Sequence, residues 1–407
     1  MNQKNMHTPE AVIPAKAGIQ SARKPWIPAF AGMTLALVLS GCSYMPQLSL
    51  PSFLGGPSDK PKPADLQPNP NLLGVRASWT ARIGNVGYPL AAHVSGNTLT
   101  LASDDGTVTA IDATTGQEMW RGSAGARIAA GVGSDGKVTA VVTRTNDVVA
   151  LENGKEIWRY KLPAQGYTAP FVAGGRVFVL AGDRSVTALD GQKGTRLWVQ
   201  QRQGEPLVLR QAGVILAVGD QLVVGQGGRL VGLNPINGSI RWEVPLATPR
   251  GINDVERLVD LVGRVSREGD VVCARAFQAA VGCVNAARGQ LLWTQKAAGA
   301  EGVHGDAANV FGAESDGKVM AWRRDTGQRA WMVDSLAHRG LTAPLVLGRS
   351  VVVGDSYGFV HLLSRENGSL LNRLSTDGSA IAAAPVVVGN NLVVVTQNGG
   401  VFAFAPQ

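Results

Sequence analysis

Two glycine motifs place side chains where nucleophilic or phosphate-binding chemistry would need them. The segment Gly354–Gly358 reads Gly-Asp-Ser-Tyr-Gly and matches the nucleophile elbow G-x-S-x-G, whose serine sits on a turn between a strand and a helix. Here the apolar runs Val351–Val353 and Phe359–Leu362 flank the motif and predict a strand on each side. We therefore interpret the segment as a hairpin turn and predict no catalytic residue.

The segment Gly131–Gly136 matches G-x-G-x-x-G, which binds a phosphate when a helix begins directly after it. The residues that follow, 138–142, read Val-Thr-Ala-Val-Val, which is typical of a strand. We interpret this motif as a turn between strands as well.

Metal-binding and nucleic-acid-binding chemistry have no clear sequence signal. After residue 42 the four histidines are scattered and lack the spacing of a ligand set; they are His93, His304, His338 and His361. The net charge is +8, and it falls to +5 without residues 1–41, which hold four of the basic residues and one acid. No stripe of Lys and Arg alternates with aromatic residues. We expect no metal, no cofactor and no nucleic-acid partner.

Cys42 is the residue with the most specific chemical signal. An apolar stretch, Thr34–Leu39, leads into Leu-Ser-Gly-Cys, which resembles the lipobox of bacterial lipoproteins, where the cysteine is acylated after cleavage. The stretch is too short to span a bilayer. We predict a signal peptide over residues 1–41 and lipidation at Cys42; the alternative is a short signal peptide with a chance cysteine. The prolines within residues 1–32 are unlike a basic leader and indicate a true start further downstream, near Met33.

Residues 43–71 hold seven prolines among Ser, Asp, Lys and Asn. Proline-rich chain is extended, at about 3.1 Å per residue. We interpret residues 42–71 as the lipidated cysteine followed by a tether that holds a domain away from a membrane surface.

From Val75 onward the sequence repeats a turn, a short strand, and a glycine with a tryptophan four positions later. The pairs are Gly116/Trp120, Gly154/Trp158, Gly194/Trp198, Gly238/Trp242, Gly289/Trp293 and Gly327/Trp331, and Gly368 is followed by Asn372 instead. From Trp120 to Asn372 the intervals are 38, 40, 44, 51, 38 and 41 residues, and Trp79 lies 41 residues before Trp120.

Each repeat holds four short strands, for example near residues 90–93, 98–102, 108–112 and 118–121. Repeated units of about 40 residues with four strands are the signature of a β-propeller. The last unit, from Ala383 to Phe404, lacks a tryptophan strand, whereas Trp79 marks a tryptophan strand without a unit. We predict a single all-β, eight-bladed propeller over residues 72–407, with four-stranded antiparallel blades and a ring closed by the strand around Trp79. Seven blades, or a linear solenoid, are the alternatives.

The repeated tryptophans are predicted to fill the space between blades, where their large area dominates packing. They are Trp79, Trp120, Trp158, Trp198, Trp242, Trp293 and Trp331. Cys273 and Cys283 flank a hairpin turn at residues 277–279 and are expected opposite each other on neighbouring strands. A disulfide, as oxidising compartments allow, and two buried thiols both remain open.

The repeat Ala-x-Asp-x-x-Thr-Gly-x-x-x-Trp, seen at residues 110–120, resembles the tryptophan-docking motif of quinoprotein alcohol dehydrogenases. That resemblance indicates a blade type and leaves the function open. It would imply a pair of adjacent cysteines beside a quinone cofactor, and this chain has no adjacent cysteines.

The combination of lipobox, proline-rich tether and eight such blades is similar to the BamB family of outer-membrane protein assembly lipoproteins. The resemblance implies a non-catalytic, monomeric scaffold subunit of the β-barrel assembly (BAM) complex, lipid-anchored in the outer membrane and facing the periplasm. Its implied partners are the POTRA domains of the barrel subunit BamA, and unfolded outer-membrane proteins. A quinone-dependent dehydrogenase, or an envelope lipoprotein with another partner, are the alternatives.

Two stretches match the partner-binding loops of that family. Residues 206–210 resemble its Leu-x-Leu-Arg loop, and residues 256–260 resemble its acidic loop, except that Val262 stands where a second acid is common. Both lie in the two longest repeat intervals, where extra length enlarges loops. The predicted partner-binding residues are Leu207, Leu209, Arg210, Glu256, Arg257 and Asp260. The alternative is that Leu207 and Leu209 alternate into a blade core as an ordinary strand.

Overall fold

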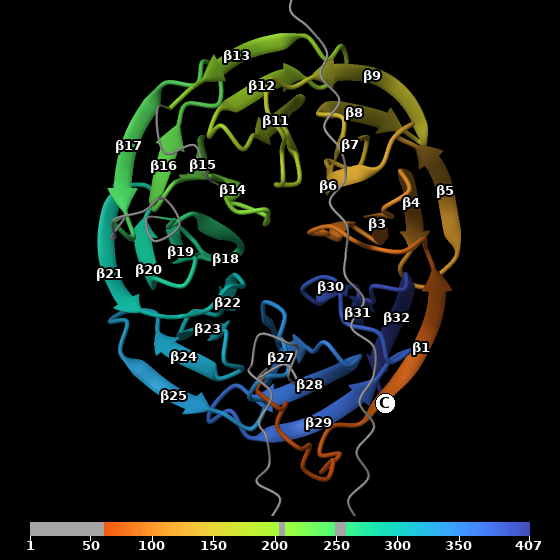
Figure 1. Cartoon of the computed structure of the whole chain (residues 1–407), viewed down its shortest axis with the longest axis vertical. Coiled ribbons are helices and arrows are strands. Elements are labelled where there is room, and N and C mark those ends of the chain that lie inside the picture. Colours follow the sequence, from red (N-terminus) through yellow and green to blue (C-terminus); the bar gives the residue numbers. More distant parts are fainter. Residues whose placement is uncertain (1–60, 203–207, 249–257) are drawn as a thin grey trace, which may run out of the picture. The chain divides into compact units, whose positions relative to one another are not determined.

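The computed structural model describes residues 61–202, 208–248 and 258–407. Cys42, Leu207, Glu256 and Arg257 lie outside the described residues. The described chain contains 32 strands in eight four-stranded sheets arranged as a ring (Figure 1). No helix in these ranges is long and apolar enough to cross a membrane.

The strands of the first four complete blades are β2 (His93–Ser95), β3 (Thr98–Ala102), β4 (Thr107–Asp112), β5 (Glu118–Ser123); β6 (Ile128–Ser134), β7 (Val138–Thr143), β8 (Asp147–Glu152), β9 (Lys155–Lys161); β10 (Phe171–Ala173), β11 (Arg176–Leu180), β12 (Val186–Asp190), β13 (Arg196–Gln200); β14 (Ile215–Val218), β15 (Gln221–Gln226), β16 (Arg229–Leu233) and β17 (Ile240–Pro245).

The strands of the remaining blades are β18 (Leu261–Glu268), β19 (Val271–Ala276), β20 (Ala280–Asn285), β21 (Gln290–Lys296); β22 (Val303–Gly305), β23 (Asn309–Ala313), β24 (Val319–Arg323), β25 (Arg329–Val333); β26 (Leu345–Leu347), β27 (Ser350–Gly354), β28 (Phe359–Ser364), β29 (Leu370–Ser375); and β30 (Val386–Val388), β31 (Asn391–Val395), β32 (Gly400–Pro406) with β1 (Val75–Arg82).

Ring closure joins the two ends of the repeat array. The last sheet has the order β1-β32-β31-β30, and in it Trp79 lies opposite Ala403 and Thr80 opposite Phe402. The predicted eight-bladed ring, closed by the strand that contains Trp79, is confirmed. Closure of this kind leaves no blade of the array without its fourth strand.

The antiparallel order gives the ring two faces. In each blade the first strand lies nearest the axis and the fourth lies at the rim (Figure 1). Because successive strands reverse direction, the turns between second and third strands share one face with the connections from each blade to the next. We call this the connection face. The turns between first and second strands, and between third and fourth strands, lie on the opposite face.

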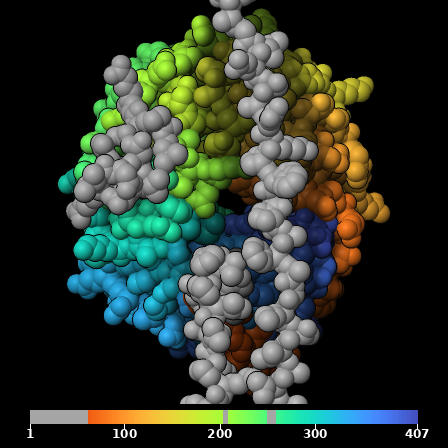
Figure 2. All heavy atoms as spheres, viewed as in Figure 1, coloured from red at the N-terminus to blue at the C-terminus, as the bar shows by residue number. Residues whose placement is uncertain are grey.

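The middle strands form the core. Strands β7, β27 and β31 are buried along their whole length, and β15 is buried at all but one residue. Neighbouring blades cover both sides of each sheet and so cause this burial. This burial explains why these strands read as continuous apolar runs instead of alternating patterns. Near the ring axis the walls have small side chains, including Ala91, Ala212, Ala300, Ala343 and Ala383. Figure 2 shows a small opening at the centre of the ring.

The repeated glycine and tryptophan meet across the boundary between blades. Gly194 lies where an added Cβ would be 2.6 Å from the Trp158 ring of the preceding blade, and Gly116 likewise meets Trp79 at 2.7 Å. The indole Nε1 of the tryptophan then donates to a carbonyl in the same turn. These bonds are Trp79 to Ala113 (2.8 Å), Trp158 to Gly191 (2.9 Å), Trp198 to Pro235 (3.0 Å), Trp293 to Arg324 (2.7 Å) and Trp331 to Arg365 (3.0 Å).

Trp242 makes the same connection indirectly. Its Nε1 donates to Gln221 Oε1 at 2.6 Å, and Gln221 Nε2 donates to the Ala286 carbonyl of the next blade at 2.8 Å. A Cβ at Gly232 would lie 2.3 Å from the indole, so the missing side chain at Gly232 makes room for this ring position.

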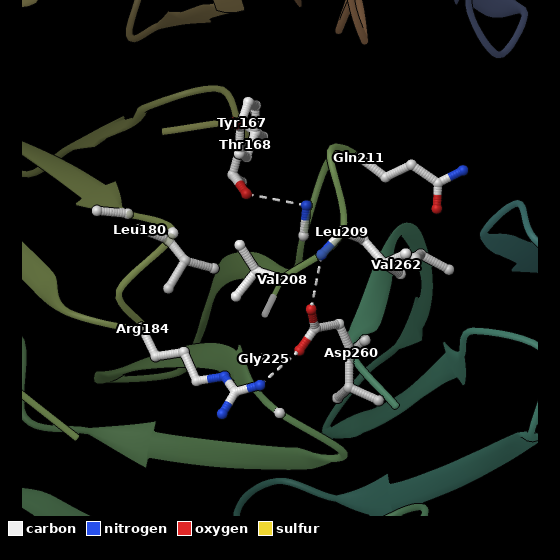
Figure 3. A pocket seen from close by; sticks show the side chains of 15 residues that line it. Tyr167, Thr168, Leu180, Arg184, Val208, Leu209, Gln211, Gly225, Asp260 and Val262 are labelled. Carbon is white, nitrogen blue, oxygen red and sulfur yellow. Dashed lines mark hydrogen bonds and ion pairs between the residues drawn. The ribbon is translucent and has the colours of Figure 1, made fainter. Parts of the chain in front are cut away.

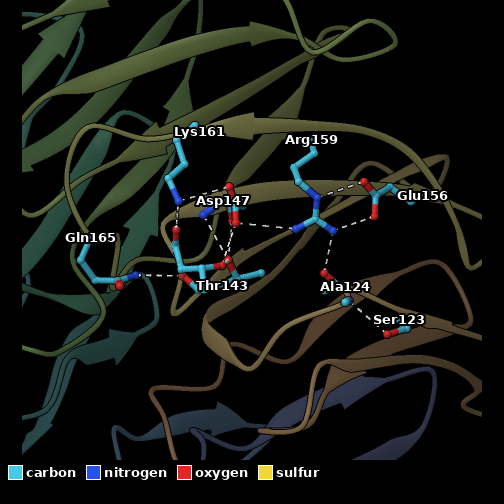
Figure 4. Close-up of polar contacts among 10 residues, drawn as sticks. Ser123, Ala124, Thr143, Asp147, Glu156, Arg159, Lys161 and Gln165 are labelled. Carbon is cyan, nitrogen blue, oxygen red and sulfur yellow. Dashed lines mark hydrogen bonds and ion pairs between the residues drawn. The ribbon is translucent and has the colours of Figure 1, made fainter.

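Polar contacts on the connection face add to the docking. Arg159 on β9 donates from Nη2 to the Ala124 carbonyl of the preceding blade at 2.9 Å (Figure 4). The same guanidinium pairs with Glu156 at 2.8 Å and with Asp147 at 3.7 Å. Each guanidinium edge therefore has an acceptor, and one of them belongs to the neighbouring blade.

Cys273 and Cys283 face each other across β19 and β20 and are joined by a disulfide. Their Cα atoms are 4.0 Å apart, and both residues are fully buried. Arg324 of the next blade donates to Cys273 Sγ at 3.3 Å. The disulfide therefore lies within a blade but against a residue whose carbonyl docks Trp293.

Candidate partner-binding site

The described parts of the two predicted loops lie side by side on the connection face (Figure 3). Residues 208–210 belong to the connection between β13 and β14, and residues 258–260 belong to the connection between β17 and β18. Leu209 lies outside any strand, so it does not alternate into a blade core as the alternative interpretation required.

Asp260 joins the two loops. Its Oδ2 accepts a hydrogen bond from the Leu209 backbone N–H at 3.0 Å, and its Oδ1 pairs with Arg184 Nη2 at 3.4 Å. The side chains of Asp260 and Arg184 are 16% and 13% exposed, so solvent screens the ion pair only in part. A charged acceptor of this kind fixes the position of the Leu209 backbone.

A shallow apolar depression surrounds this contact. Its wall includes Tyr167, Leu180, Val208, Leu209 and Val262 (Figure 3). Arg210, which follows Leu209 in the chain, is exposed. Apolar side chains beside an arginine and a carboxylate are typical of protein–protein interfaces, in which a few residues supply most of the affinity.

The structure brings Leu209, Arg210 and Asp260 into one surface, while their roles toward a partner stay predictions. Val262 is buried on β18, so a carboxylate there would need a change in the local packing. Sequence reasoning missed Arg184, which lies in the short turn between β11 and β12. The positive φ of 63° at this residue belongs to the turn, and nothing in the sequence pattern places that turn beside Asp260.

The two enzyme-like motifs lie on strands and hairpins, as the flanking residues predict. Ser356 lies in the turn between β27 and β28, and its Oγ donates to the Gly340 carbonyl at 3.1 Å. His361 bonds Asp355 Oδ2 through Nε2 at 3.0 Å and has no contact with the serine hydroxyl among the observed bonds. The residues 131–136 lie within β6 and in its turn to β7.

Several ionisable groups near the ring axis have strongly shifted pKa values. Arg264 donates to the Pro385 carbonyl at 2.9 Å, and burial lowers the pKa of Arg264 to about 10. Burial, together with the charges of Arg264 and Arg324, lowers the pKa of His304 to about 3. Burial raises the pKa of Glu301 against the opposing charge of Arg275. In the described ranges no three His, Cys, Asp or Glu side chains gather as they would around a metal ion.

Comparison with known proteins identifies the family. The family model described as outer membrane protein assembly factor BamB matches residues 104–333, which is more than half of the chain. This chain belongs to the BamB family.

Relatives along most of the chain support the BamB assignment. The outer membrane protein assembly factor BamB of Burkholderia pseudomallei is 39% identical over 340 residues, covering 83% of this chain and 89% of the relative. The protein of the same name from Bordetella pertussis is 37% identical over 371 residues, covering 90% of this chain and 94% of the relative. Both relatives are named as assembly factors.

Solved structures share the fold of this BamB-family chain. The crystal structure of BamB from Moraxella catarrhalis has a TM-score of 0.75 at 24% identity and covers 81% of this chain and 99% of that chain. The quinohemoprotein alcohol dehydrogenase of Comamonas testosteroni has a TM-score of 0.64 at 14% identity, covering 84% and 78%. At such identities the likeness shows a propeller fold that hosts both kinds of protein.

Proposed function

We propose that this protein is a non-catalytic scaffold lipoprotein of the outer-membrane β-barrel assembly machinery. It is held in the outer membrane through Cys42, faces the periplasm, and binds the POTRA domains of BamA through residues 207–210 and 256–260. The names of its relatives support the membership in outer-membrane protein assembly. The contact between Asp260 and the Leu209 backbone supports the site, because it unites two loops that are separated by a whole blade in the sequence.

The chemistry of the surface fits a protein partner. Leu209 and Val208 are half-buried and offer apolar area, while the exposed Arg210 offers donors to a carboxylate or a backbone carbonyl. Leucine anchors beside an arginine gain affinity when a partner excludes water from them. Asp260 is already engaged with Leu209 and Arg184, so we assign it mainly to positioning the loops.

The direct test is the recovery of BamA with a triple variant in which Leu207, Leu209 and Arg210 are changed to alanine. Loss of two or three anchors weakens binding by at least about tenfold, since each tenfold step corresponds to about 1.4 kcal/mol. Leu197 and Val199 on the rim strand β13 are exposed apolar residues outside this surface, and their double alanine variant is the matched control. Equal recovery of BamA with the triple variant and the control would remove the site assignment.

A second arm separates positioning from contact. Asp260→Ala removes the acceptor of the Leu209 N–H and the partner of Arg184, while leaving the apolar anchors in place. We expect weaker BamA binding together with faster amide exchange at Leu209. Weaker binding without a change in exchange would instead place Asp260 in direct contact with the partner.

The anchor and the absence of catalysis are tested separately. Cys42→Ser is expected to move the protein from the membrane fraction to the soluble fraction.

Addition of pyrroloquinoline quinone and calcium is expected to produce neither a new chromophore nor dye-linked alcohol oxidation. A bound chromophore with oxidation activity would overturn the non-catalytic role.

A further inference from the structure

Residues 64–73 run along the edge of a blade before the first strand begins. We call them the strap. They lie beside β29, the rim strand of the blade β26–β29, and form the orange segment next to that strand in Figure 1. The proline-rich composition predicts a tether over residues 42–71, but each end of the strap is hydrogen-bonded to the ring.

The strap begins on the connection face. The Ala64 N–H donates to the Ala337 carbonyl at 2.9 Å, and Arg339 Nη1 donates to the Ala64 carbonyl at 3.1 Å. Residues 337–339 belong to the connection between β25 and β26. Leu66, like Trp331, packs against the buried cluster that includes Leu341.

Arg339 is itself held in place. Its Nε donates to Asp355 Oδ2 at 2.7 Å, and its guanidinium lies over the Tyr357 ring at 4.7 Å. Asp355 also accepts bonds from the Tyr357 and Phe359 backbone N–H groups at 2.9 Å. Ala64 is therefore held by a buried ion pair, in which both oxygens of the Asp355 carboxylate accept hydrogen bonds.

The strap ends on the opposite face. Asn69 exchanges hydrogen bonds with the backbone of Arg373 at 3.0 Å in each direction. The Leu72 N–H donates to the Leu371 carbonyl at 2.8 Å, and Arg349, in the turn between β26 and β27, donates to the Leu72 carbonyl at 3.0 Å.

The strap changes the face from which the N-terminal part of the chain leaves the ring. β1 takes the place of a fourth strand, so its first residue, Val75, lies on the opposite face. A chain leaving directly from Val75 would therefore depart from the face opposite to Leu209 and Asp260. The strap instead returns it across the rim to the connection face. There it leaves beside residues 337–339, two blades along a ring of eight from the loop at residues 258–260.

We infer that the strap makes the connection face the membrane-facing surface of the protein, so that the lipid surface and the partner are met from the same side. The inference rests on the proposed lipidation at Cys42. From residue 43 to residue 63 there are 21 residues, which extend to at most about 75 Å at about 3.3–3.6 Å each. A partner held in the same membrane is then met at a raised local concentration, without the chain having to pass around the ring.

The orientation is measured on lipidated protein bound to phospholipid vesicles that contain a nitroxide headgroup quencher. A fluorophore is attached through Asn398→Cys, in the turn between β31 and β32 on the connection face, or through Glu366→Cys on the opposite face. Both side chains are exposed and lie in neighbouring blades. Cys42 is acylated and the remaining two cysteines form the disulfide, so the label reacts only at the new thiol.

We expect stronger quenching at position 398 than at position 366. Equal quenching, or stronger quenching at 366, would overturn the inference. The Cys42→Ser protein is the control: if it is quenched as much as the lipidated protein, the anchor proposal fails, and the orientation is then not attributed to the tether.

Two variants connect the orientation with the strap. Leu66→Asp combined with Asn69→Ala should release the strap and abolish the difference between the two labels, while soluble protein keeps its affinity for BamA. Because that variant could also perturb folding, a deletion of residues 48–57 shortens the tether without touching the described ring and should enlarge the difference. A difference that survives strap release, or that does not grow with the shorter tether, contradicts the inference.

Discussion

Neighbouring blades pack together in one way at the tryptophan-docked junctions and in another way at the junction after β29. At most junctions the rim tryptophan of one blade covers a glycine in the next blade's turn between third and fourth strands and donates to a carbonyl there. After β29 the receiving blade has no such turn, because its third and fourth strands, β32 and β1, are the two ends of the repeat array.

Asn372 replaces tryptophan at this junction, and its Nδ2 donates to the Leu73 carbonyl at 2.7 Å. Leu73 and Gly74 occupy the place of the missing turn, and the Gln407 N–H donates to the Gly74 carbonyl at 3.0 Å. A broken turn offers no fixed glycine for an indole to cover. The strap supplies instead the backbone bond from Leu72 to Leu371 and the two bonds between the Asn69 side chain and the Arg373 backbone on β29. A docked tryptophan therefore depends on an intact turn between the third and fourth strands of the next blade, and not on the presence of a blade alone.

The largest expected effect is the loss of a docked tryptophan. Trp158→Ala removes a side chain that is 8% exposed and its bond to the Gly191 carbonyl. Such truncations cost about 3–5 kcal/mol, because a cavity remains beside the lost area. Urea unfolding followed by fluorescence and circular dichroism measures the change. A cost below about 1 kcal/mol would show that the blades do not depend on the docking.

The next effect tests the glycine on which the indole rests. Gly194→Ala places a Cβ 2.6 Å from the Trp158 ring, at a residue with φ of +69°. We expect a cost of roughly 2–4 kcal/mol from the left-handed backbone and the clash together. Gly174 has φ of +59° with nothing within 4 Å of an added Cβ, so Gly174→Ala reports the backbone cost alone. Equal unfolding free energies for the two variants would contradict close glycine–indole packing.

Acid distinguishes the two kinds of junction, since the strap is clamped by ionisable groups. Burial, opposed by Asp355, holds the pKa of His361 below its ordinary value. Burial acts to raise the pKa of Asp355, but bonds from His361, the Phe359 N–H and Arg339 keep it lowered. In both cases the unfolded chain binds protons more readily than the folded protein, so stability falls as the pH drops.

For His361 the loss begins as the pH falls through about 6.5, and it amounts to at most roughly 2 kcal/mol between pH 7 and pH 5. For Asp355 it begins below about pH 4. His361→Gln keeps a side-chain donor toward Asp355 and does not titrate between these values. The difference in unfolding free energy between pH 7 and pH 5 should therefore shrink in this variant. An unchanged difference would assign the acid sensitivity to other groups, such as His304.

The smallest effect sharpens the role of Asn372. Asn372→Ala removes the bonds to the Leu73 carbonyl and from Asn69, and should cost about 1–2 kcal/mol. We expect faster amide exchange at Leu72 and in β1 with little change at Trp158. Exchange that rises equally in all blades would indicate a general loss of stability and not a local one.

Much of the fold follows from the spacing of a few residue types. The repeats of glycine and tryptophan predict the number of blades and the closing strand, because each blade must present the same residues to its neighbour. The spacing does not reveal that each glycine meets the tryptophan of the preceding repeat and not the one four positions later. That pairing depends on how the sheets stack. The long repeat intervals likewise indicate the candidate loops, but Arg184, which completes the ion pair with Asp260, comes from a turn of ordinary length.

The strap shows the limit most clearly. Composition indicates an extended segment over residues 43–71, since proline and polar residues disfavour regular strands and helices. Composition does not tell whether such a segment stays in solvent or lies against an edge, because that depends on acceptors and apolar surface presented by residues some 300 positions away. The sequence by itself determined a ring of repeated blades and a family. Only the tertiary structure decided which face the chain leaves from, because faces exist only after the strands have paired.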